Sequence, residues 1–338
     1  MTARLNQVRS NGLQKPIIMI QGIDYVTEGN SDRGRMLRYH EAGRIGLPFR
    51  ALNKTAFQHD LTHLPNATRD LTTIVTEDGE IQSRFAIGFE IEKSSFHRGA
   101  VKEYPLMSHF EYDSSCGVEA VTNLLPLVDK GVWRNKVLSM FSEARKIIDD
   151  RYSPSTQRCG GHITLSCVGM TGQDLADKLR PYAGIIYALW RFRLRNSYCY
   201  GNLMMSPSTD YHQWVGHTTG SKYHVCKIMD DRIEFRLPNR VQSVEGLNLR
   251  YRLMYELINY AVNKPNGTYA GFIKKVKSIL LFMYDGNEAK VDEVVTLSKA
   301  FRKMLMSGKI NADVVQWVDQ YNRLTAHYTT SLRRETER

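Results

Sequence analysis

The 338-residue sequence has few cysteines, and their spacing excludes the common cysteine-based sites. The five cysteines are odd in number, and no two of them form a CxxC pair. Zinc modules and secreted disulfide frameworks need such pairs, or an even and closely spaced set. The simplest interpretation is a group of reduced thiols in a cytosolic protein. The cysteines are Cys116, Cys159, Cys167, Cys199 and Cys226.

Long apolar runs are also missing from the sequence. The longest, around Ile279–Tyr284, is far shorter than the roughly 20 residues that a membrane-spanning helix needs. Met1–Ser10 carries scattered arginines and no apolar segment, which argues against a signal peptide. The sequence shows no internal repeat and no low-complexity tract. We therefore expect a cytoplasmic protein with no membrane partner.

Acidic residues are outnumbered by basic ones, 35 Asp and Glu against 46 Lys and Arg, which gives a formal net charge of +11. This excess suggests an anionic partner such as a nucleotide, a nucleic acid or an acidic substrate. A merely cationic, soluble surface is equally compatible with it. The hydrophobic content of 42% is sufficient for a substantial core.

Two neighbouring glutamates interrupt an otherwise apolar strand in RFAIGFEIEK, Arg84–Lys93. Alternation of apolar residues with smaller or polar ones is the period-two pattern of a β-strand. Glu90 and Glu92 therefore share one face, with Cα atoms about 7 Å apart. Two carboxylates so placed repel unless a cation lies between them, and Mg²⁺, which takes oxygen ligands and is often shared with phosphates, fits. Two harmless glutamates on a solvent-facing strand are the alternative.

Three further segments, GVEAVT, GHITLS and RIEFRL, repeat this arrangement of one apolar and one polar face. A sheet built from such strands would have an apolar back against helices and a charged concave front, which suits a magnesium–nucleotide site. Taken singly, a histidine or an arginine on such a face is often only a structural hydrogen-bond or ion-pair partner. The polar-face residues are Glu119 in the first segment, His162, Thr164 and Ser166 in the second, and Arg232, Glu234 and Arg236 in the third.

The remaining pattern predicts strands alternating with helices, followed by a helical region. Expected strands cover Ile81–Glu92, Gly117–Leu125, Gly161–Val168, Lys222–Met229 and Arg232–Leu237, with a further short one at Pro16–Ile20. Expected helices cover Asn135–Arg151, a segment opening at Thr171, Ala183–Asn196, Gly246–Val262, Tyr269–Met283, Asp292–Ser307 and Ala312–Thr325. The order indicates a mixed α/β or α+β core. We divide the chain into an N-terminal extension of unknown role (1–80), a catalytic core (81–263) and a helical C-terminal region (264–338).

The ordered series GFEIE, EYDSSCGVEAVTNLLP, CGGHITLS, LRNSYC, SKYHVCKI and RIEFRLP resembles the motif series of the amidoligase family. This family belongs to the glutamine synthetase and glutamate–cysteine ligase superfamily of carboxylate–amine ligases. The resemblance covers about Arg84–Asn263, roughly half the chain. It implies an α+β fold with a curved, mainly antiparallel sheet, helices on one face and a helical C-terminal region. No single motif is decisive, and the order of the set carries the resemblance.

The chemistry that the resemblance implies has two steps. ATP phosphorylates a carboxylate to an acyl phosphate, and an amine or ammonia then displaces the phosphate to form an amide or isopeptide bond. Two or three Mg²⁺ ions bridge the ATP phosphates and the carboxylate. The expected partners are therefore ATP, a carboxylate substrate (an amino acid, a peptide or a protein) and an amine. An oligomer is possible, but the ring shape of the glutamine synthetases does not transfer to this chain.

The resemblance also implies roles for individual residues. Glu90, Glu92, Glu119, His162 and Glu234 match metal-binding positions. The catalytic set is Arg236, which stabilises charge on the transferred phosphoryl group, together with Asp113 and Glu119; Asp113 and Ser114 match an element that positions the substrate or amine, in which Ser114 replaces a glycine. His162, Lys222, Arg195 and Ser114 are the expected nucleotide or phosphate contacts.

One departure from the family pattern leaves alternatives open. Thr164 stands where the family often has a second histidine, and threonine does not replace an imidazole ligand. The chain could therefore be a degenerate ligase that acts as a nucleic-acid-binding or phage-type structural protein, using the aromatics of Tyr187–Tyr200 as a stacking surface. Nucleic-acid binding has no use for strand-front carboxylates, whereas the ligase requires them. A ligase acting on a modified base, a peptide or a protein tail is an intermediate possibility.

Overall fold

The structure is a computed structural model, and it describes most of the chain from residue 85 to residue 307. Within that range the gaps are 98–103, 105, 123–124, 168–169, 195–214, 217–224 and 230–231. Before residue 85 it describes only the backbone of strands β1 to β5. These form a three-stranded antiparallel sheet of β1 (Leu5–Ser10), β2 (Leu13–Ile20) and β3 (Ile23–Val26), and a hairpin of β4 (Thr73–Thr76) and β5 (Gly79–Gln82). The expected strand at Pro16–Ile20 lies within β2.

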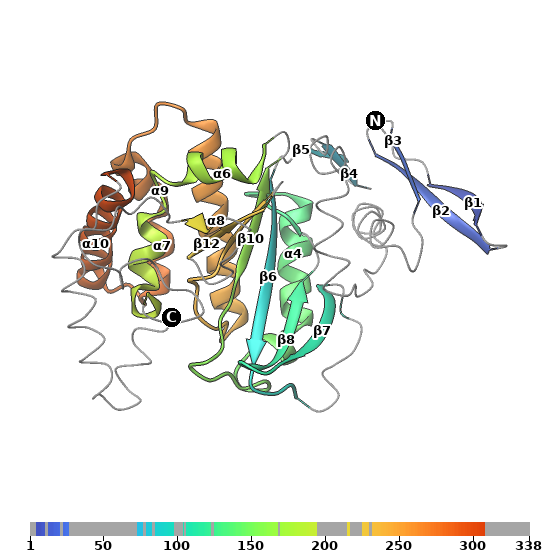
Figure 1. The fold of residues 1–338 in the computed structure, drawn as a ribbon, viewed down its shortest axis with the longest axis horizontal. Helices are drawn as coiled ribbons and strands as arrows, with labels where there is room; N and C mark the ends of the chain where they lie inside the picture. Colours follow the sequence, from blue (N-terminus) through green and yellow to red (C-terminus); the bar gives the residue numbers. More distant parts are fainter. Residues whose placement is uncertain are drawn as a thin grey trace.

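The centre of the fold is a curled, mainly antiparallel sheet whose order is β11-β12-β13-β10-β6-β8-β7, with β9 pairing β6 (Figure 1). Only β11 and β12 are parallel neighbours among the described strands. The fold class is therefore α+β, as expected. The strands are β6 (Phe85–Lys93), β7 (Met107–Asp113), β8 (Gly117–Thr122), β9 (Leu125–Pro126), β10 (Ile163–Cys167), β11 (Val215–Gly216), β12 (Cys226–Ile228) and β13 (Arg232–Phe235).

The described helices are α4 (Val132–Glu143), α5 (Arg145–Ile148), α6 (Gly172–Leu179), α7 (Gly184–Leu189), the short 3-10 helix η1 (Arg191–Arg193), α8 (Val244–Asn263), α9 (Tyr269–Met283) and α10 (Glu288–Ser307). Helices α4 and α8 lie behind the sheet, and α7, α9 and α10 form a group beside it (Figure 1). No helix in the described part of the chain has the length and apolar character to cross a membrane.

The apolar strand faces pack against α4 and α8, as the alternation predicts. Ile87, Ile91 and Ile163 on the sheet have no exposed surface. Phe89 meets Phe141 of α4 edge-on, with ring centroids 6.1 Å apart. Because every second residue of each strand points into this layer, the intervening polar residues must share the opposite face.

Some helix boundaries differ from the sequence prediction for local reasons. The helix expected over Asn135–Arg151 is divided into α4 and α5 at Ala144. The helix expected over Ala183–Asn196 is reduced, in its described part, to α7 and η1. Helix α8 begins before its expected start, because the Ser243 hydroxyl accepts a hydrogen bond from the Gly246 amide and caps it. The helix expected at Ala312–Thr325 lies outside the described residues.

Tyr251 joins α8 to the sheet through its phenol. Its hydroxyl donates to the Pro126 carbonyl at 2.6 Å and accepts from the Val128 amide at 2.8 Å, and the side chain is fully buried. Burial raises the pKa of Tyr251 to about 12, so the phenol stays neutral at physiological pH.

We predict that Tyr251→Phe lowers the free energy of unfolding by about 1–3 kcal/mol, because it leaves a buried amide and a buried carbonyl without their partner. Chemical denaturation measures this loss. Tyr260→Phe on the same helix is the matched control, since its hydroxyl makes only an exposed bond to the Thr268 carbonyl, and should cost less than about 1 kcal/mol. Equal losses in the two variants would contradict the role given to Tyr251.

Candidate functional site

Strand register brings the predicted polar residues together on one face of the sheet. Glu234 lies opposite Thr164, which in turn lies opposite Gly88 of β6. Glu92 lies opposite Glu119 of β8. His162, one residue before β10, continues the ladder, because its carbonyl accepts from the Glu90 amide at 3.1 Å. Four segments that are distant in sequence thus supply one front.

The carboxylates and the histidine converge at the centre of this front. His162 Nδ1 lies 2.6 Å from Glu90 Oε2 and 4.0 Å from Glu234 Oε1. One ligand atom from each of these three residues lies within 4.8 Å of the other two. Two carboxylates and an imidazole at this separation fit a divalent cation, Mg²⁺ through the oxygens and Mn²⁺ through all three groups. The geometry therefore permits a metal site at Glu90, His162 and Glu234.

Glu92 lies beside this trio and contacts the other side of the imidazole. Its Oε1 is 3.6 Å from His162 Nε2, while its Oε2 accepts a 2.5 Å hydrogen bond from the Gly160 amide. A carboxylate on the far nitrogen of a metal-binding histidine fixes its tautomer and ring orientation. The position of Glu92 suits that orienting task as well as direct coordination.

The front is buried, although its residues are charged. Glu119, His162 and Glu234 expose 2%, 5% and 3% of their surface. A buried carboxylate requires a compensating partner, because its desolvation costs several kcal/mol. The buried carboxylates of Glu119 and Glu234 therefore each need a positively charged or hydrogen-bonding partner.

Arg236 supplies part of the compensation. Its guanidinium donates to Glu234 Oε1, and its side chain is mostly buried. Burial lowers the pKa of Arg236, but the carboxylates of Glu234, Glu90 and Glu92 raise it further, so the net shift is upward. Within the described contacts, three carboxylates share this guanidinium and the His162 imidazole.

Gly160 lies between the cluster and Arg193, which was not among the predicted site residues. A Cβ atom on Gly160 would lie 3.1 Å from each of Glu92 Oε1, His162 Nε2 and Arg193 Nη2. Arg193 of η1 is buried, and its Nη1 donates to the Cys159 carbonyl at 2.8 Å. Arg193 lies in the second half of the expected helix Ala183–Asn196, and periodicity alone does not distinguish a buried arginine there from one exposed to solvent.

The other predicted residues lie at the margin of the cluster or outside the described residues. Asp113 Oδ1 accepts from the Ser115 amide and hydroxyl, both at 2.6 Å, which fixes the β7–β8 turn that also holds the exposed Ser114. Burial, with the carboxylates of Glu92 and Asp113, raises the pKa of the nearby Cys116 thiol, which therefore stays neutral. Arg195 and Lys222 lie outside the described residues.

Comparison with known proteins gives little further information. No protein-family model and no curated protein matches the sequence. Among solved structures, the chain is similar to GmaS in its apo form without ligand, at 10% sequence identity and a TM-score of 0.32 over 98% of this chain and 84% of that chain. At this identity and TM-score, the similarity has no bearing on the chemistry of the site.

We predict that Gly160→Ala weakens binding of Mn²⁺ to the cluster by at least about tenfold, because the added methyl displaces groups that orient His162. Titration of Mn²⁺ followed by electron paramagnetic resonance measures the affinity. Gly246→Ala, in the first turn of α8, is the control: its Cβ would meet only Ser243 Oγ, at 3.2 Å, and the affinity should not change. Wild-type affinity in Gly160→Ala would show that the close packing around Gly160 is irrelevant to the site.

Proposed function

We propose that the chain is an ATP-dependent carboxylate–amine ligase of the amidoligase kind, which forms an amide or isopeptide bond through an acyl phosphate. The observation that supports this most is the convergence of Glu90, His162 and Glu234 from separate strands onto one buried front. The sequence motifs that resemble the amidoligase family supply these three residues in the same order along the chain.

Glu90, His162 and Glu234 would hold a divalent cation, and Glu92 would orient His162 or join the ligands. When bound, Mg²⁺ would neutralise charge on the ATP phosphates and on the substrate carboxylate. Glu119, opposite Glu92, would extend the metal-binding face. Nothing in the donor set conflicts with magnesium, since carboxylate oxygens predominate.

Arg236 would stabilise the charge that develops on the oxygens of the transferred phosphoryl group. Positioning and electrostatic stabilisation dominate the catalysis of phosphoryl transfer, and a fixed guanidinium supplies both. Its contact with Glu234 would hold it at the metal site before the substrate arrives. Asp113 and Ser114 would position the substrate or amine, and His162, Lys222 and Arg195 would contact the nucleotide.

Enclosure of the front serves the same chemistry. Acyl phosphates react with water, so the site that forms them has to exclude bulk solvent. The low exposure of Glu119, His162, Thr164 and Glu234 fits such a site. A surface that binds nucleic acid through stacking and cationic side chains has no need for buried carboxylates.

We predict that wild-type protein binds Mg-ATP, and that Glu90→Gln and Glu234→Gln each weaken this binding by about 10- to 100-fold, because each removes a charged ligand while keeping the side-chain shape. Isothermal titration calorimetry with and without Mg²⁺ gives the affinities. Glu143→Gln, an exposed residue of α4, is the matched control and should bind as the wild type does.

Amine-dependent release of ADP in the presence of candidate carboxylates would then identify the substrates. Absence of Mg-ATP binding, or binding indifferent to both cluster variants, would contradict the ligase and make the cluster a structural ion-pair network. Metal-independent retention of DNA or RNA by the same protein would favour the degenerate-ligase alternative.

A further inference from the structure

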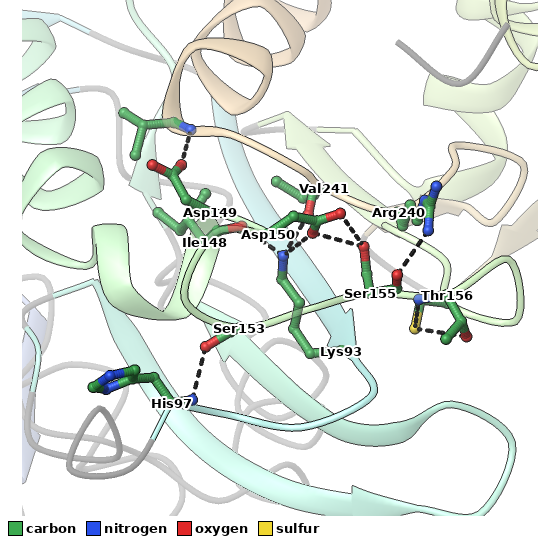
Figure 2. A network of polar contacts seen from close by, with 12 residues as sticks. Lys93, His97, Ile148, Asp149, Asp150, Ser153, Ser155, Thr156, Arg240 and Val241 are labelled. Atoms are coloured by element: carbon green, nitrogen blue, oxygen red, sulfur yellow. Dashed lines mark hydrogen bonds and ion pairs between the residues drawn. The ribbon is translucent and has the colours of Figure 1, made fainter. Parts of the chain in front are cut away.

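A buried lysine lies next to the carboxylate cluster but on the opposite face of its strand. Lys93 follows Glu92 in β6, and its side chain has no exposed surface. Its ammonium donates to the Ile148 carbonyl at 2.6 Å, to Asp150 Oδ1 at 2.7 Å and to the Val241 carbonyl at 2.8 Å (Figure 2). An ammonium has three N–H groups, so each of them has an acceptor.

These acceptors belong to two segments, 148–150 and 239–241, and the second of them also contacts the Gly160 region of the cluster. Gly160 forms a bridge with Asn239, and the Gly161 amide donates to the Pro238 carbonyl at 3.1 Å. Arg250 of α8 fixes the second segment by donating to the Asn239 carbonyl at 2.6 Å and to its side-chain oxygen at 2.5 Å. The ammonium and the Gly160 region are thus held by the same backbone.

The segment 150–160 passes around the end of β6, from the ammonium on one face to Glu92 on the other. Ser155 Oγ donates to both oxygens of Asp150, and the Ser155 carbonyl accepts from Arg240 at 2.7 Å. The Ser94 amide donates to the Pro154 carbonyl at 2.8 Å. The segment ends with the Gly160 amide, which donates to Glu92 Oε2. Figure 2 shows the part of this route from Lys93 through Asp150 to Ser155 and Thr156.

We propose that Lys93 is a positioning residue for the carboxylate cluster: its ammonium holds segment 150–160 so that the Gly160 amide orients Glu92, and through it His162. This inference deepens the proposed ligase site and rests on it for its functional consequence. A structural lysine that only stabilised the fold would leave the Gly160–Glu92 bond unchanged as long as the protein stayed folded.

A specific label makes the Gly160 amide observable. The sequence contains the dipeptide Cys-Gly only at Cys116–Gly117 and Cys159–Gly160. Labelling with ¹³C-carbonyl cysteine and ¹⁵N-glycine therefore yields two amide signals in a carbonyl-filtered spectrum. Glu92→Gln identifies the Gly160 signal, because it weakens the charge-assisted bond to that amide. Chemical denaturation of the same protein measures the free energy of global unfolding.

The test compares Lys93→Met with Lys146→Met, an exposed lysine of the neighbouring α5. In Lys93→Met the Gly160 amide proton should shift upfield, and its hydrogen exchange should accelerate by about tenfold more than the fall in global stability explains, because the local opening is favoured. The affinity for Mn²⁺ should fall by about 10- to 100-fold. Lys146→Met should change none of these.

An unchanged Gly160 signal in folded Lys93→Met would overturn the proposal. So would a faster hydrogen exchange at Gly160 that the fall in global stability fully explains, because it indicates a merely structural role. If Lys93→Met does not fold, Asp150→Asn replaces it and should move Gly160 in the same direction; an unmoved signal in that variant overturns the proposal. A shifted Gly160 signal in a protein that binds no Mn²⁺ even as wild type would support the positioning and refute the ligase site, so the two failures are distinguishable.

Discussion

The compensation of buried carboxylates is the constraint on which the front of the sheet depends. Glu92, Glu119 and Glu234 are buried, and Glu90 contacts the His162 imidazole beside them. Leaving one such charge without a partner costs several kcal/mol, which is a large part of the stability of an ordinary domain. Each of three carboxylates has such a partner: Glu234 contacts Arg236, Glu90 contacts His162, and Glu92 accepts from the Gly160 amide. A bound cation would add a further partner for Glu90, His162 and Glu234.

The rest of the fold keeps these groups in place. The apolar faces of the strands pack on α4 and α8, and that burial fixes which side chains share the front. A register slip of one residue would move the carboxylates into the apolar layer. Lys93 differs from the other residues of the apolar face because it is charged. Its ammonium is stabilised there by hydrogen bonds to three oxygens. The site is thus supported from both faces of β6.

Alternation along single strands predicted the two faces of the sheet, including the shared front of Glu90, His162, Glu234 and Arg236. It succeeded because a strand has a fixed period of two, which ties face to position without knowledge of the partner strand. The sequence also predicted helix α9 with its bounds, Tyr269–Met283, and the α+β class. The division of the chain into domains and the roles of individual residues remain predictions.

Residues placed by irregular segments were not predictable in the same way. Gly160 and Arg193 reach the cluster through a loop and a 3-10 turn, whose paths depend on tertiary hydrogen bonds rather than on periodicity. The period-two pattern does place Lys93 on the apolar face, because it continues the series Phe85, Ile87, Phe89 and Ile91. A lysine at such a position needs buried acceptors, and that requirement points to a built network.

Anomalous X-ray diffraction from crystals grown with Mn²⁺ in excess would decide whether the cluster of Glu90, His162 and Glu234 binds a metal ion. We expect an anomalous peak within coordination distance of Glu90, His162 and Glu234, with the His162–Glu90 hydrogen bond opened to admit the ion. A map without a peak there, in which His162 Nδ1 remains hydrogen-bonded to Glu90 and Arg236 to Glu234, would contradict this expectation and leave a self-sufficient ion-pair network on the front of the sheet.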